Sequence, residues 1–187
     1  MVDVREASFA VFAHFGVDRL FGNPGSTELP MLKAMPFPYV MGLNEAVVMG
    51  MADGYARSSG KPALVNLHSA AGTGHSLGNL FTAWKNNAPV VVTAGQQARS
   101  ILPFDPFLGA ERPTEFPRPY VKFALEPARA EDVPLALARA FAIALTPPMG
   151  PVFVSIPVDD WERTCEMPAL PDLSLTTLAH PAGLARI

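Results

Sequence analysis

Hydrophobic and polar positions along the chain follow two alternating periods. Short runs of consecutive apolar residues, each closed by Gly, Pro or Asn, are typical of buried strands. Between these runs, apolar residues recur three or four positions apart, which predicts helices. The predicted strands are 19–21, 39–43, 63–67, 90–92, 120–124 and 152–156. The predicted helices are one that opens at Asp3, then 27–35, 45–58, 73–84 and 130–145.

This alternation of strands and helices indicates one α/β domain with a doubly wound sheet. The runs rich in Val and Ile, such as 90–92, lack the two-residue alternation of a half-exposed strand, as expected for parallel strands buried on both faces. We therefore predict a mostly parallel six-stranded sheet flanked by helices. In open sheets of this kind, ligands bind beyond the carboxyl ends of the strands.

Two of the predicted helices have a marked pattern. In the helix 45–58, one face carries the larger apolar side chains and another carries small residues at a spacing of four. The larger residues are Val47, Val48, Met51 and Tyr55, and the small ones are Ala46, Gly50 and Gly54. In the helix 130–145, a single apolar face is expected to pack on the sheet. It consists of Val133, Leu137, Ala140, Phe141 and Ala144.

Two segments show no regular period. Residues 96–119 contain five prolines and are too long for a simple connector, so a functional loop is the better interpretation. From residue 159 onward the chain is polar and contains prolines. We predict a domain over residues 1–160 and a linker or tail over 161–187, with the abrupt end favouring a truncated chain over a complete small subunit.

Composition narrows the classes of protein. The 187 residues are 49% hydrophobic and 17% charged, which argues against disorder. Net charge is −3 with scattered Lys and Arg residues, so neither nucleic acid nor a membrane is an expected partner. The single Cys165 excludes an internal disulfide and a multi-cysteine metal site. A cytoplasmic protein without a metal site of its own is the expectation.

Candidate functional residues lie directly after four of the predicted strands, in segments 23–26, 44–45, 68–74 and 95–97. Glu45 begins a helix that is otherwise apolar for six positions, and such surroundings raise the pKa of a carboxyl group; a helix-terminal acid favoured by the dipole is the alternative. His68 is a general acid–base candidate or a core imidazole. Ser26 is a carboxylate ligand or a helix cap. Gly72 and Thr73, in a Gly-Thr-Gly turn, offer amides for an anion.

Five stretches of the chain, in order, resemble one known family. They are FGNPGSTELP, LNEAVVMGMADGYARSSGKPALVNLHSAAGTGHSLGNL, AWKNNAPVVVTAGQQAR, PRPYVKF and GPVFVSIPVDDW. Together they span about residues 15–161 and are similar to the N-terminal pyrimidine-binding domain of thiamine-diphosphate-dependent enzymes, in particular of benzoylformate decarboxylases. The stretch around NEAVVMGMADGYAR is shared across the superfamily, whereas HSAAGTG and TAGQQ are narrower.

The resemblance implies roles for individual residues. Glu45 would hydrogen-bond N1′ of the cofactor's aminopyrimidine and so promote loss of the thiazolium C2 proton. Ser26 would contact the carboxylate of a 2-oxo acid, and His68 would relay protons during non-oxidative release of CO2. The wall beside the cofactor would include Pro24 and Gly25, with Gly72 and Thr73 as further cofactor contacts. Phe107 and Leu108 would line a pocket suited to an aromatic substrate.

The resemblance also implies parts that this chain lacks. In the family, a second domain holds the diphosphate and Mg²⁺ through a Gly-Asp-Gly motif, which does not occur here. We therefore expect the diphosphate-binding domain of another subunit as partner, in a homodimer or homotetramer, and expect the isolated chain to be inactive. The alternatives are another thiamine-diphosphate activity, such as an acetolactate synthase-like or oxalyl-CoA reaction, a stand-alone subunit of a two-chain enzyme, and a non-catalytic module that keeps the fold.

Overall fold

The computed structural model describes residues 1–170, which form a three-layer α/β domain. All neighbouring strands of its six-stranded sheet run parallel, in the order β3-β2-β4-β5-β7-β6. These strands are β2 (Leu20–Asn23), β3 (Tyr39–Met41), β4 (Ala63–Leu67), β5 (Val90–Gln96), β6 (Ala124–Leu125) and β7 (Val152–Pro157). The prediction of a mostly parallel six-stranded sheet flanked by helices is confirmed.

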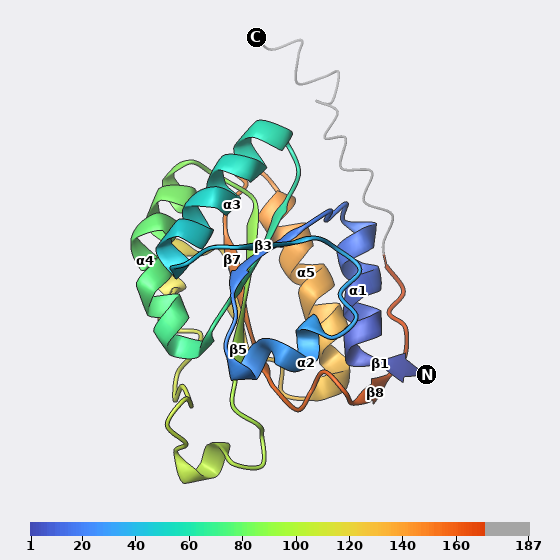
Figure 1. Cartoon of the computed structure of the whole chain (residues 1–187). Helices are drawn as coiled ribbons and strands as arrows, with labels where there is room; N and C mark the ends of the chain where they lie inside the picture. Colours follow the sequence, from blue (N-terminus) through green and yellow to red (C-terminus); the bar gives the residue numbers. More distant parts are fainter. Residues whose placement is uncertain (171–187) are drawn as a thin grey trace, which may run out of the picture.

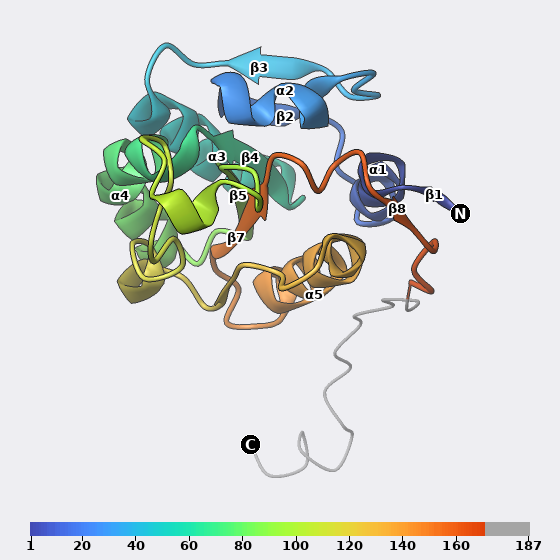
Figure 2. The same ribbon diagram turned by 90° about the horizontal axis from the view of Figure 1, so that it is seen from below.

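Helices cover both faces of the sheet (Figure 1). On one face lie α1 (Val4–His14) and α5 (Val133–Leu145), and on the other lie α3 (Glu45–Ser59) and α4 (Ser69–Lys85). The short α2 (Leu29–Leu32) follows a 3-10 turn at Ser26–Glu28, beside the carboxyl ends of the strands (Figure 2). Further 3-10 turns are Leu102–Phe104, Arg118–Tyr120 and Ala130–Asp132.

The sheet separates two apolar cores. Every predicted apolar residue of the helix 130–145 is fully buried, and Phe141 stacks on Phe15 with ring centroids 4.9 Å apart. On the opposite face, α3 buries Val48, Met49 and Ala52 against the sheet. Val47, grouped with Val48 on one face from the sequence, is 53% exposed, so that face is only partly buried. Because α3 is apolar on nearly all sides at its start, helical period alone does not select the buried face.

Local signals fix the helix ends. Asp3 caps α1 through a 2.7 Å hydrogen bond from the Glu6 amide, and the Asn44 side chain caps α3 by accepting from the Ala46 amide. Gly60 ends α3 at φ +70°, a conformation that glycine adopts without steric cost. The start of α4 differs from the prediction: it lies at Ser69 and not at Thr73.

The beginning of the predicted tail packs against the domain. The two-residue strands β1 (Val2–Asp3) and β8 (Thr164–Cys165) pair antiparallel, and Trp161 is 2% exposed. Burial raises the pKa of the Cys165 thiol, which does not favour the reactive thiolate. The domain boundary at residue 160 stays a prediction, and most of the predicted tail, 171–187, lies outside the described residues.

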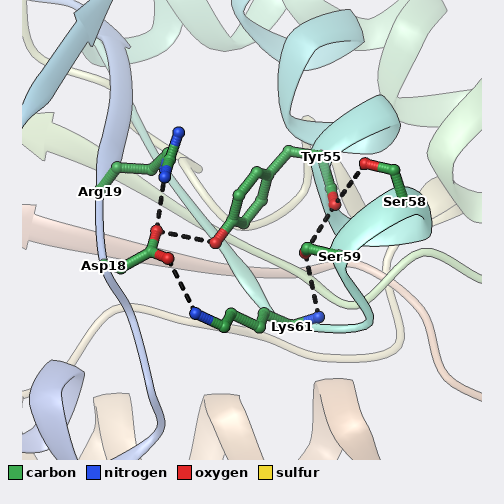
Figure 3. Close-up of polar contacts among 6 residues, drawn as sticks. All are labelled: Asp18, Arg19, Tyr55, Ser58, Ser59 and Lys61. Atoms are coloured by element: carbon green, nitrogen blue, oxygen red, sulfur yellow. Dashed lines mark hydrogen bonds and ion pairs between the residues drawn. The ribbon is translucent and has the colours of Figure 1, made fainter.

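A polar cluster joins three elements at the amino ends of the strands (Figure 3). Asp18, just before β2, accepts hydrogen bonds from Arg19 at 2.8 Å, from Tyr55 of α3 at 2.7 Å and from Lys61 at 2.9 Å. These donors, Arg19 first, hold the pKa of the Asp18 carboxyl well below its usual range. The cluster ties the end of α3 to the start of the sheet, at the edge opposite the carboxyl ends.

No helix within residues 1–170 is both long and apolar enough to cross a membrane.

Candidate active site

A buried carboxylate organises the carboxyl edge of the sheet. Glu28 is 1% exposed and accepts four hydrogen bonds. The Gly25 amide at 2.8 Å and His68 Nδ1 at 2.8 Å reach Oε2, while the Thr27 hydroxyl at 2.6 Å and the Gly95 amide at 3.1 Å reach Oε1. Glu28 therefore connects the segments that follow β2 and β4 with the carboxyl end of β5.

This arrangement selects the tautomer of His68. Because Glu28 accepts hydrogen bonds from three other donors, the hydrogen of the His68 contact lies on Nδ1. In the neutral imidazole Nε2 then carries a lone pair, and this atom makes no hydrogen bond within residues 1–170. The side chain is 24% exposed, so it is accessible without lying in bulk solvent. An oriented imidazole with one free nitrogen is suited to proton transfer.

The backbone at this corner is unusual in two places. A Cβ at Gly25 would overlap the imidazole ring of His68, so the two segments meet closely only because residue 25 is glycine. Ser69, directly after His68, has φ +49°, which is uncommon for a residue with a side chain. Such strained positions concentrate at functional sites, where the surrounding structure enforces them.

Ser26 is exposed and stands next to this corner. The 3-10 turn is capped at Gly25, so Ser26 is not a helix cap. Among the described residues, the Ser26 hydroxyl has no hydrogen-bond partner and is free to bind a ligand. Pro24, half-buried, precedes Gly25 in the same segment.

Glu45 lies at the start of α3 and is 7% exposed. Its carboxylate packs on the first turn of α4, where a Cβ at Gly72 would lie 3.1 Å from Glu45 Oε1. His75, one turn further along α4, places Nδ1 3.0 Å from Glu45 Oε2. The buried position expected for this acid is confirmed, and the helix that begins after His68 is the element that Glu45 contacts.

One expected feature of the site is wrong. Gly72 and Thr73 were expected to offer free amides in a turn, yet both lie inside α4. The Gly72 amide donates to the His68 carbonyl at 2.7 Å, and the 1% exposed Thr73 donates its hydroxyl to the Ser69 carbonyl. Neither group is available to an anion. Glycine at position 72, which has no side chain, leaves space for the Glu45 carboxylate.

The loop between β5 and β6 lies beside this edge. Phe107 is fully exposed and Leu108 is half-buried, so their role as pocket residues stays a prediction. Next to the first turn of α4, the loop borders an open cavity of about 470 Å³. Its lining is Ala70, Gly109, Ala110, Glu111, Arg112, Glu115 and Phe116.

From the sequence alone, Glu28 was missed and no role was assigned to His75. The signal for Glu28 was a glutamate three residues after Gly25, in the position where a capping-box side chain reaches back to the cap amide. His75 lies three residues after Gly72, hence on the same side of α4. Within residues 1–170 no cluster of three His, Cys, Asp or Glu side chains has the arrangement of a metal site.

Comparisons with known proteins agree with this geometry. Residues 2–112 match the family model described as thiamine pyrophosphate enzyme, N-terminal TPP binding domain. Over the whole chain, the sequence is 46% identical to benzoylformate decarboxylase of Pseudomonas aeruginosa, covering 37% of that protein.

Two further matches place the chain among related enzymes. A solved structure of a 4-hydroxybenzoylformate decarboxylase from Rhodococcus jostii RHA1 superimposes with a TM-score of 0.87 at 43% identity, over 88% of this chain and 32% of that one. The large subunit of acetolactate synthase from Buchnera aphidicola (subsp. Schizaphis graminum) is 33% identical over 80% of this chain and 27% of that protein. The chain thus spans about a third of the length of these relatives.

Proposed function

The chain belongs to the thiamine pyrophosphate enzymes as their N-terminal TPP binding domain, and from this we propose that it is the cofactor-activating part of a 2-oxo acid decarboxylase. The observation that carries the proposal is the Glu45 carboxylate, 7% exposed at the start of α3 and packed on the helix that follows His68. An aromatic substrate is favoured because two relatives are named benzoylformate and 4-hydroxybenzoylformate decarboxylase. Identity to the acetolactate synthase is lower, at 33%.

The residues present suit the aminopyrimidine end of thiamine diphosphate. Glu45 Oε2 is engaged by His75, whereas Oε1 has no hydrogen-bond partner in the described part of the chain. Oε1 is therefore the atom we assign to hold a proton shared with the pyrimidine N1′. When bound, the cofactor supplies the nucleophile and the electron sink of decarboxylation. Pro24 and Gly25 would form the adjoining wall.

Two side chains would act on the substrate. The free Ser26 hydroxyl would donate a hydrogen bond to the carboxylate of the 2-oxo acid and orient it. His68 would exchange a proton through Nε2, while Glu28 keeps Nδ1 protonated and the ring in place. In this proposal Glu45 serves the cofactor and Glu28 orients the His68 imidazole, and the two carboxylates have separate contacts, Glu45 with His75 and Glu28 with His68.

The diphosphate and Mg²⁺ would be held outside this domain, by the diphosphate-binding domain of another subunit in a homodimer or homotetramer. Exposed large apolar side chains on and near α3 and α4 support such an assembly, since they are candidates for burial against another subunit. They are Met41, Leu43, Val47 and Phe81, with exposed fractions between 43% and 90%. Gly50 and Gly54, both exposed on α3, would permit close approach of another backbone.

Glu45→Gln tests the central assignment in the complete enzyme. Loss of the shared proton is expected to lower turnover of benzoylformate by about 10²- to 10⁴-fold, the usual range for general acid–base catalysis. Glu162→Gln, an exposed carboxylate outside the loop and the cavity, is the matched control. Turnover that survives Glu45→Gln would remove this residue from the mechanism. A panel that includes pyruvate separates decarboxylation of aromatic acids from acetolactate synthesis.

The isolated chain offers an independent test. Calorimetric titration with thiamine diphosphate and Mg²⁺ is expected to show no tight binding, because the chain lacks the groups for the diphosphate. Tight binding by these 187 residues alone would contradict the assignment of the diphosphate to another domain.

A further inference from the structure

The loop beside the candidate site is attached to the end of β5 by one buried side chain. Gln96 is 1% exposed, and its amide pairs with Ala110 as a peptide group would in a sheet. Nε2 donates to the Ala110 carbonyl at 2.9 Å, and Oε1 accepts from the Ala110 amide at 3.0 Å. This double hydrogen bond joins residues 14 positions apart in the sequence.

The orientation of the Gln96 amide is itself determined. Oε1 accepts a second hydrogen bond from the Gln97 amide at 3.0 Å, and Nε2 faces the Glu126 carboxylate at 3.5 Å. Glu126 is in turn fixed by the Ser155 hydroxyl of β7 at 2.6 Å. An amide with a carboxylate on one side and two N–H donors on the other has only one satisfactory orientation.

A second attachment holds the beginning of the same loop. Arg99 makes a bidentate pair with the 1% exposed Asp160, at 2.8 and 2.7 Å, and its amide donates to Asp159. Bidentate guanidinium–carboxylate pairs define geometry as well as add energy. The loop is therefore fixed at residue 99 and again at residue 110, so the segment after residue 110 starts from a defined point.

The segment after residue 110 forms the cavity wall. Glu111, Arg112, Glu115 and Phe116 line the cavity of about 470 Å³ together with Ala70, two residues after His68. The Phe116 ring packs over Gly74 on α4, where a Cβ would lie 3.5 Å from the ring. A volume of this size is within the range of small-molecule pockets, and Phe116 gives it one aromatic side chain on which a planar apolar group can pack.

We propose that Gln96 is a positioning residue whose pairing with Ala110 holds segment 109–116 as a wall of the substrate cavity, so that the site accepts a bulky aromatic 2-oxo acid. The proposal rests on the proposed function for the identity of the substrate. The attachment of the loop stands on the hydrogen bonds alone and is testable without turnover.

Hydrogen exchange of the Ala110 amide in the 187-residue chain tests the attachment. In Gln96→Ala, this amide loses its acceptor and is expected to exchange at least about fivefold faster, as loss of one typical hydrogen bond predicts. Thr114→Ala is the control, since that side chain makes no hydrogen bond in the described chain and lies in the same loop. Unchanged exchange of Ala110 in Gln96→Ala would overturn the proposal.

Substrate selectivity in the complete enzyme tests the consequence. A displaced wall is expected to lower kcat/KM for benzoylformate about tenfold more than for pyruvate, whereas a general structural defect lowers both equally. Equal losses would overturn the positioning role. If Gln96→Ala does not fold, Ala110→Pro breaks the pair from the loop side by removing the N–H donor, and the same selectivity change is expected. No turnover of any 2-oxo acid by the unsubstituted enzyme would refute the proposed function, and Ala110 exchange would still decide the attachment.

Discussion

Replacing Glu28 by glutamine is expected to destabilise the domain strongly although the side chain keeps its shape. The carboxylate accepts from Gly25 and His68 on one oxygen and from Thr27 and Gly95 on the other. Whichever oxygen becomes the NH2 group, two of these four donors face another donor.

The size of the stability loss depends on whether each of the four donors can accept a hydrogen bond instead. The Thr27 hydroxyl can rotate and the His68 ring can change tautomer, so each of these can accept from the new NH2 group. The amide of Gly25 or Gly95 cannot, and one buried N–H without a partner costs about 1–3 kcal/mol. The remaining hydrogen bonds lose the strength that a charged acceptor gives, which adds about 1 kcal/mol. A total of about 2–4 kcal/mol corresponds to a fall in Tm of about 5–12 °C for a chain of this size.

Thermal unfolding of the isolated chain, followed by circular dichroism, measures this effect. Glu111→Gln is the control for stability, because its carboxylate is 88% exposed and contributes little. If Glu28→Gln melted within about 1 °C of the unsubstituted chain, Glu28 would not be the acceptor that these four donors share, and the assigned tautomer of His68 would fall with it.

Three further predictions concern stability and are checked by urea unfolding. Asp18→Asn is expected to lower the free energy of unfolding by about 1 kcal/mol at pH 7. Because the pKa of folded Asp18 is depressed, this stabilisation is present above about pH 4 and declines as pH falls further. An equal loss of stability at pH 7 and at pH 2 would contradict this prediction. Phe141→Ala, which removes a fully buried ring, is expected to cost about 3–5 kcal/mol, and a loss below about 1 kcal/mol would contradict the packing. Ser69→Gly is expected to stabilise by up to about 1 kcal/mol by relieving φ +49°, whereas Ser76→Gly inside the same helix should destabilise.

Much of the architecture was predictable because local signals and the global fold agree. The cap at Asp3 marked the start of the first helix, and the apolar face of α5 was identified residue by residue. The parallel sheet followed from Val-rich strands that alternate with helices, and parallel strands place their carboxyl ends at one edge. Grouping Ser26, Glu45 and His68 at that edge required no coordinates.

Tertiary structure decided which partners these residues have. The start of α4 at Ser69 depends on a positive φ that no propensity predicts, and it moved Gly72 and Thr73 from a turn into a helix. Glu28 acquires its role from donors that lie far apart in the sequence. Gly25 and Thr27 precede it closely, whereas His68 and Gly95 follow it by 40 and 67 residues. The repeat of apolar positions in the sequence determines which helices and strands form, because it reflects which side chains of a whole turn or strand are buried. A hydrogen-bond network depends on single atoms brought together by packing, and only the folded chain determines those positions.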